Sequence, residues 1–266
     1  MRPKHFFTLA IIFTVLAVPA CSNPSLKKTV DYINKSYKYE SKVKTIFDDL
    51  DKDTDEWNTE FSEMTQVQES ISNKESAKQL VGQEELNKEK DAIERMRGLA
   101  DREDKRLMTA GGYVVRIERA REEATQKIEE LKSTLGSGWA EDYIDISLQI
   151  NEQRSVYYRT MYDLYTKVWD GSRLQLQVAE AKLALQTKAN GADIDTYNAA
   201  IDEWNRFTTA INPRIESNTK EVEVFKKLVG SMDTAIDKLE RKRSAIARDN
   251  SVRALFEKDM ELADLK

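Results

Sequence analysis

"VVRIERAREEATQKIEELKSTLGSGWAEDYIDISLQI", residues 114–150, contains the pattern that decides the fold. Its apolar positions recur every three or four residues, which is the spacing of one face of an α-helix. These positions are Val114, Ile117, Ala120, Ala124, Ile128, Leu131 and Leu135, then Tyr143, Ile146 and Ile150. The glycines of "GSGW" (residues 136–139) separate the two runs and predict a turn. Helices that are joined by a short turn pack antiparallel, so this stretch predicts a helical hairpin.

The same spacing continues outward in both directions, from residue 26 to about residue 250. Segments of about 50 residues would form helices about 75 Å long. We therefore expect an all-α fold, an elongated antiparallel three- or four-helix bundle with long coiled-coil-like helices. The bundle domain covers residues 26–250, and residues 251–266 form a C-terminal tail.

Glycine and proline mark the expected interruptions of these helices. We expect Gly82 to end the first long segment, Gly191 to end the third, and Asp193 to cap the fourth. The pair Gly111-Gly112 lies inside a helical run, where it predicts a kink or a close contact with another helix. Pro213 lies inside the last run, where it predicts a kink.

The composition excludes several classes of function. Asp and Glu number 47 against 42 Lys and Arg, for a net charge of −5, which differs from the basic surface of a nucleic-acid-binding protein. His5 and Cys21 are the only histidine and cysteine. Both lie in the first 21 residues, so the rest of the chain lacks the residues for His- or Cys-dependent catalysis, zinc or haem sites. We predict a non-enzyme with no cofactor and no metal; a carboxylate-based glycan hydrolase is the less favoured alternative.

The first residues have the pattern of an export signal. Arg2 and Lys4 precede an apolar run of thirteen residues, 6–18, which is too short to span a bilayer. "LAVPAC" (residues 16–21) resembles the lipobox of bacterial lipoproteins, which implies a signal peptide over residues 1–20 and acyl chains such as palmitate on Cys21. Residues 21–25 then form a short tether. An ordinary secretory signal followed by a chance cysteine is the alternative.

The acidic stretch "DLDKDTDEWNTE", residues 49–60, partly matches a calcium-binding loop. The matching acids are Asp49, Asp51, Asp53 and Glu60. Thr54 occupies the place where the loop needs glycine. We interpret the stretch as an acidic joint between two helical segments, with Asp53 or Thr54 capping the second.

Aromatic residues concentrate in "YYRTMYDLYTKVW", residues 157–169. Four of them share one stripe of a helix: Tyr158, Tyr162, Tyr165 and Trp169. The functional interpretation is a platform on which sugar rings stack. The structural alternative is a seam in the core, because large aromatics dominate buried surfaces.

Basic residues gather near the C-terminus. The candidates for contact with an anionic surface are Lys238, Arg241, Lys242 and Arg243. The alternative is an ordinary solvated helix face.

The chain resembles the YkyA-type cell-wall-binding lipoproteins of Gram-positive bacteria in three features. These are the predicted lipid-modified cysteine, the tyrosine-rich helix and the stretch "IDEWNRFTTAINPRIESNTKEVEVFKKL" (residues 201–228). The resemblance implies a polar and aromatic series at helical spacing, filled here by Asn205, Phe207, Thr208, Asn218, Thr219 and Phe225.

From these observations we expect a lipid-anchored, non-catalytic helical protein of the cell envelope that associates with the cell wall or peptidoglycan. It would be extracytoplasmic, on the outer face of the cell membrane in a Gram-positive host or on the outer membrane in a Gram-negative host. The alternative is a protein-interaction scaffold with a coiled-coil partner or a homodimer. The expected partners are the membrane, peptidoglycan or another envelope protein, and no nucleic acid.

Overall fold

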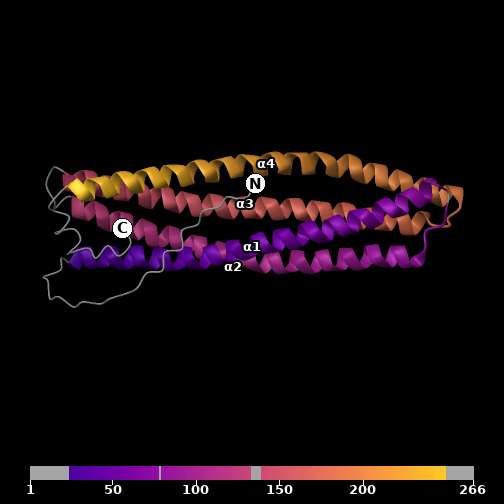
Figure 1. Cartoon of the computed structure of the whole chain (residues 1–266), viewed down its shortest axis with the longest axis horizontal. Helices are drawn as coiled ribbons and strands as arrows, with labels where there is room; N and C mark the ends of the chain where they lie inside the picture. The colour runs from indigo at the N-terminus through magenta and orange to yellow at the C-terminus, as the bar shows by residue number, and fades with distance from the viewer. Residues whose placement is uncertain (1–23, 78, 133–138, 250–266) are drawn as a thin grey trace.

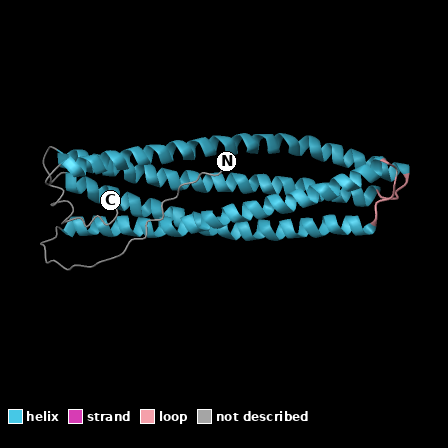
Figure 2. Cartoon of the chain, in the orientation of Figure 1, coloured by secondary structure: helices cyan, strands magenta, loops and turns pink. Residues whose placement is uncertain are grey.

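The computed structural model describes residues 24–77, 79–132 and 139–249, which form four long α-helices (Figure 1). They are α1 (Pro24–Ser76), α2 (Gln83–Lys132), α3 (Trp139–Ala189) and α4 (Ile194–Asp249). The helices alternate in direction along an elongated bundle, and no strand occurs in these residues (Figure 2). The expected all-α bundle is confirmed, with four helices. The predicted signal peptide, Cys21, the glycines of "GSGW" and the C-terminal tail lie outside the described residues.

A regular heptad repeat makes α2 a core helix. Its buried positions alternate in steps of three and four residues: Leu86, Glu89, Ile93, Met96, Ala100, Glu103, Leu107, Ala110, Val114, Ile117, Arg121, Ala124 and Ile128. A sustained repeat of this kind keeps one seam of the helix against its neighbours, as in a coiled coil. Only three of these positions hold charged residues, which are Glu89, Glu103 and Arg121.

Side chains of α1 and α3 complete this core. Phe47 of α1 stacks on Tyr165 of α3 with ring centroids 4.7 Å apart. Trp57 of α1 meets Trp169 of α3 edge to face at 5.7 Å, and its indole Nε1 donates a hydrogen bond to Gln175 Oε1 at 3.0 Å. The main core therefore lies among α1, α2 and α3.

α4 lies against α3, on the other side of α3 from α2 (Figure 1). Among its described residues only Ala200, Ile211, Ile236 and Arg243 are buried. α4 is therefore an outer helix that shares little of the core.

The helix ends confirm one prediction and correct another. Gly191 has a φ of 70°, and Asp193 Oδ1 accepts a hydrogen bond from Thr196 N at 2.8 Å, as expected for a helix stop followed by a cap. Gly82 does not end α1, which stops at Ser76. Gly82 instead precedes α2: its carbonyl accepts from Glu85 N, and its own N–H donates to Glu85 Oε2 at 3.3 Å, which is a reciprocal cap.

Residues 49–60 form no joint, contrary to the interpretation of the acidic stretch, because α1 continues through them. Asp53 caps nothing and pairs with Arg102 and Arg106 of α2. Thr54 Oγ1 donates back to Leu50 O at 2.9 Å, inside the helix. Cationic partners on α2 thus allow a run of acids to stay helical.

The interruptions expected inside helices cause no break. α2 is continuous through Gly111, where an added Cβ would lie 3.1 Å from Tyr162 Oη, so the expected close helix contact is confirmed. α4 continues through Pro213, whose side of the helix is exposed.

Candidate functional site

The aromatic stripe of α3 is largely a core seam, which corrects its interpretation as a sugar-stacking platform. Trp169 is 1% exposed and Tyr165 is 8% exposed, so neither offers a face to a ligand. Tyr165 Oη donates to Asp51 Oδ1 at 2.9 Å, and burial raises the pKa of the tyrosine. Tyr158 and Tyr162 are half-buried against the same core. α3 lies between α2 and α4, and so both of its sides are covered.

The basic candidates near the end of α4 separate into two groups. Lys238, Arg241 and Lys242 are exposed. Arg243 is 3% exposed, which corrects its assignment to an anionic surface contact. Its position at the helix face that meets α3 explains the burial, because Ile236 lies one heptad earlier on that face.

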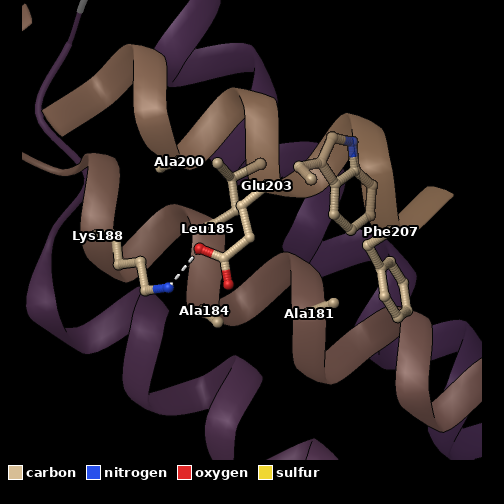
Figure 3. Close-up of a pocket in the computed structure, with 8 residues that line it drawn as sticks. Ala181, Ala184, Leu185, Lys188, Ala200, Glu203 and Phe207 are labelled. Carbon is tan, nitrogen blue, oxygen red and sulfur yellow. Dashed lines mark hydrogen bonds and ion pairs between the residues drawn. The ribbon is translucent and has the colours of Figure 1, made fainter. Parts of the chain in front are cut away.

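A pocket lies between α3 and α4, near the end of the bundle where the two helices are joined (Figure 3). α3 contributes Ala181, Ala184, Leu185 and Lys188, and α4 contributes Ala200, Glu203, Trp204 and Phe207. The rings of Trp204 and Phe207 stack at 6.0 Å and form one wall. Across the mouth, Lys188 Nζ and Glu203 Oε2 form an exposed ion pair at 2.7 Å.

Small side chains create this pocket. Ala181 and Ala184 lie one turn apart on α3, opposite the two aromatic rings of α4. Alanine leaves room where leucine elsewhere fills the space between helices. The periodic pattern does not reveal the pocket, because alanine counts as apolar in it. The signal in the sequence is the alanine-rich run at residues 179–184.

The size and chemistry of the pocket limit what it can hold. Its volume is about 90 Å³, smaller than an apolar cavity of about 150 Å³ that holds benzene. A pyranose ring with its hydroxyl groups is larger than benzene and would also leave them facing alanine and aromatic carbon. The pocket therefore fits an aliphatic side chain better than a sugar.

Apolar side chains are exposed around the same end of the bundle. Ile194 is 75% exposed, Tyr197 is 46% exposed, and Leu80 in the segment between α1 and α2 is 79% exposed. Asn190 Nδ2 donates to Val81 O at 3.2 Å, which holds the two connecting segments together. Clustered exposed apolar residues are typical of protein-interaction sites.

A buried ionic network joins the helices near the opposite end. Glu40 of α1 is 4% exposed and forms ion pairs with Arg121 of α2 and Arg154 of α3. Arg154 Nη2 also reaches Glu240 Oε1 of α4 at 2.5 Å, so the network touches all four helices. Burial alone would raise the pKa of Glu40, but the two arginines outweigh it and hold that pKa below its ordinary value. Every charge has a counter-charge, which is the arrangement of a structural network.

Two further carboxylates occupy core positions of α2 and differ in the hydrogen bonds that they accept. Glu89 Oε1 accepts from Gln68 Nε2 of α1 at 2.6 Å. Glu103 is 0% exposed, and within the described residues neither of its oxygens accepts a hydrogen bond; Arg106 Nη1 lies 3.5 Å from Oε1. Neither carboxylate faces the pocket between α3 and α4.

Within residues 24–77, 79–132 and 139–249, no group of three or more His, Cys, Asp or Glu side chains is placed to hold a metal ion. None of the helices in those ranges combines the length and apolarity that crossing a membrane requires. No family model, curated protein or solved structure matches the chain.

Proposed function

We propose that the protein is a lipid-anchored, non-catalytic helical adaptor of the bacterial envelope. Its α3–α4 pocket receives an aliphatic side chain of a partner protein. The observation that carries the proposal is the pocket of about 90 Å³ between Ala181, Ala184 and the Trp204–Phe207 wall. Aromatic anchors around an apolar pocket are typical of the residues that dominate binding energy at protein interfaces.

The place of the pocket supports an adaptor. α1 starts at Pro24, three residues after Cys21, and its 53 residues span about 80 Å. The pocket lies at the far end of the bundle from that start (Figure 1). Acyl chains on Cys21 would tether the near end to the outer face of the cell membrane, or to the outer membrane of a Gram-negative host. The partner would then be met at the far end.

Protein binding replaces wall binding as the leading proposal. Wall binding depended on the stripe from Tyr158 to Trp169 and on the basic residues near the end of α4. Two of the four rings are buried, and so is Arg243. A homodimer and a peptidoglycan strand become outcomes of the test below. Exposed Ile194 and Tyr197 lie within two turns of Ala200, so a partner would cover them together with the pocket.

In-cell photo-cross-linking tests the proposal. A photoreactive phenylalanine analogue replaces Phe207 in the pocket wall, and in a second strain it replaces exposed Thr219 on the same helix. We expect a discrete protein adduct from position 207 only. Ala184→Leu fills the pocket from a position that is already exposed, and should reduce the adduct at least fivefold. Ala199→Leu, exposed but outside the pocket, is the matched control.

Three results would overturn the adaptor proposal. The first is an equal adduct pattern at positions 207 and 219. The second is an adduct of 207 with another copy of this chain alone, which would assign the pocket to a homodimer. The third is co-sedimentation with purified peptidoglycan that Ala184→Leu abolishes and Ala199→Leu does not, which would make a wall glycan the ligand.

A further inference from the structure

A cluster of exposed cations lies on the α1–α2 face, away from the pocket. It consists of Lys38 and Lys42 of α1 with Arg116 and Arg119 of α2, which we call the basic patch. None of the four forms an ion pair with another described residue. In a chain with a net charge of −5, a group of four such cations is a local exception.

Acidic residues are sparse around Lys38, Lys42 and Arg116, whereas the exposed Glu122 and Glu123 lie one turn beyond Arg119. Between Asp31 and Asp48 the only acid is Glu40, which is buried in the four-helix network. Between Asp104 and Glu122 the only acid is Glu118, which pairs with Arg159 of α3 at 2.7 Å. No acid therefore lies one helical turn from Lys38, Lys42 or Arg116, and their positive charge faces solvent.

Farther along α1 and α2, positive and negative side chains of the two helices pair with one another. Arg95 pairs with Glu60 at 2.8 Å, and Arg102 pairs with Glu56 at 2.5 Å. The excess of positive charge is thus confined to the part of the α1–α2 face near the start of α1.

Two tyrosines hold part of the basic patch in place. The rings of Tyr39 and Tyr113 lie 6.3 Å apart across the α1–α2 boundary. The guanidinium of Arg116 lies 5.9 Å and 5.5 Å from these two rings, and Lys42 Nζ lies 5.4 Å from the ring of Tyr113. Cation–π contacts at these distances orient a cation and leave its outer side open to an anion.

Exposed apolar side chains adjoin the basic patch on α2. Met108 is 75% exposed and Val115 is 39% exposed, one heptad apart on the outer face of the helix. Cations together with apolar side chains and tyrosine form the combination that suits a membrane interface, where headgroup phosphates and acyl chains lie close together.

We propose that the basic patch binds the phosphate groups of anionic phospholipids and lays the α1–α2 face against the membrane surface. Lys38 and Lys42 lie about 21–27 Å along α1 from Pro24, so a chain anchored at Cys21 keeps them near that surface. The inference rests on the envelope location in the proposed function, but not on the pocket. α3 and α4 would then face away from the lipid and leave the pocket open.

Vesicle binding by the lipid-free chain starting at residue 22 tests the proposal, because every contact described above lies within residues 24–249. The probes are vesicles of 30% phosphatidylglycerol in phosphatidylcholine and vesicles of phosphatidylcholine alone. We expect binding to the anionic vesicles only, and weaker binding as salt rises. Each cation near an anionic surface corresponds to roughly a fivefold change in partitioning.

The variant Lys38→Gln/Arg119→Gln should therefore weaken binding about 25-fold. It spares Lys42 and Arg116, which contact the tyrosines. The matched control is Lys227→Gln/Arg214→Gln, which removes one lysine and one arginine from exposed positions of α4 and should leave binding unchanged. Circular dichroism checks that both variants stay folded.

A second experiment tests which face of the bundle contacts the membrane. Because the chain has no cysteine after Cys21, a fluorophore can be attached at one chosen cysteine. An environment-sensitive fluorophore on Ser41→Cys, beside the basic patch, should shift to the blue with anionic vesicles, whereas one on Thr219→Cys of α4 should not. Equal binding to both kinds of vesicle, equal loss in the two double variants, or a shift at position 219 alone would overturn the proposal. So would binding to a soluble polyphosphate without any binding to vesicles. None of these results depends on a protein partner, so a failed cross-linking experiment remains a separate outcome.

Discussion

α2 and α4 have similar lengths, 50 and 56 residues, but the bundle holds them in different ways. α2 buries every core position of its heptad repeat between α1 and α3, whereas α4 buries four of its described residues. Burial of apolar surface supplies most of the stability of a helix in a protein. Two helices with equally clear periodicity can therefore differ greatly in how firmly they are held.

Polar contacts hold much of α4. Asn218 Nδ2 donates to Lys167 O at 2.9 Å, and Lys167 Nζ pairs with Glu221 at 2.7 Å. Exposed ion pairs contribute at most about 1 kcal/mol each. α4 therefore belongs to the regions that open before the whole fold does, and the predictions below test this difference from the core.

Trp169→Ala should have the largest effect. Trp169 of α3 is 1% exposed and packs against Trp57 of α1, and truncating a buried tryptophan costs about 3–5 kcal/mol. Trp204→Ala makes the same chemical change at a half-buried site on α4 and should cost less than half as much. Urea unfolding of both variants measures the difference. Equal losses would contradict the division into a three-helix core and an outer α4.

Glu40→Gln should cost about 3 kcal/mol at neutral pH, because it leaves Arg121 and Arg154 without their shared buried counter-charge. The pKa of Glu40 is lowered from 4.5 in the folded state. Its stabilising contribution is therefore complete above the unfolded pKa and is lost as pH falls through the folded pKa.

Urea unfolding at several pH values should show this loss. The difference in the free energy of unfolding between the native chain and Glu40→Gln should be constant from pH 7 to about pH 5. This gap should close as pH falls further below 4.5. Glu122→Gln, at an exposed position of α2, is the control and should show no gap at any pH. A gap that persists at low pH would show that the ionic network is not its cause.

Glu103→Leu should have the smallest effect and the opposite sign. Glu103 occupies a core position without a hydrogen bond to its carboxylate among the described residues, and its partner Arg106 also pairs with Asp53. An apolar side chain of similar volume there should add about 1–3 kcal/mol of stability. Glu89→Leu is the contrasting variant, because it removes the acceptor of Gln68 Nε2 and should not stabilise. A loss of stability in Glu103→Leu would show that the carboxylate has a favourable role in the core.

Periodicity was sufficient to predict the fold class and the cap at Asp193, because both depend on neighbours within one or two turns of a helix. It could not predict which faces another helix covers. The stripe of Tyr165 and Trp169 is as regular as an exposed platform would be, and only the position of α3 between α2 and α4 makes it core. The acids around Asp53 look like a joint until Arg102 and Arg106 are brought beside them from about 50 residues away.

The start of α1 and the end of α4 lie at the same end of the bundle, and the pocket lies near the other. A tether before Pro24 and a pull on the pocket would therefore act along the helix axes. Such a load slides antiparallel helices past one another, and the side-chain contacts along their length resist it together. A force that separates residue 24 from residue 249 would instead peel α4 from α3 one turn at a time. The direction of the force, more than its magnitude, therefore determines whether the bundle resists unfolding.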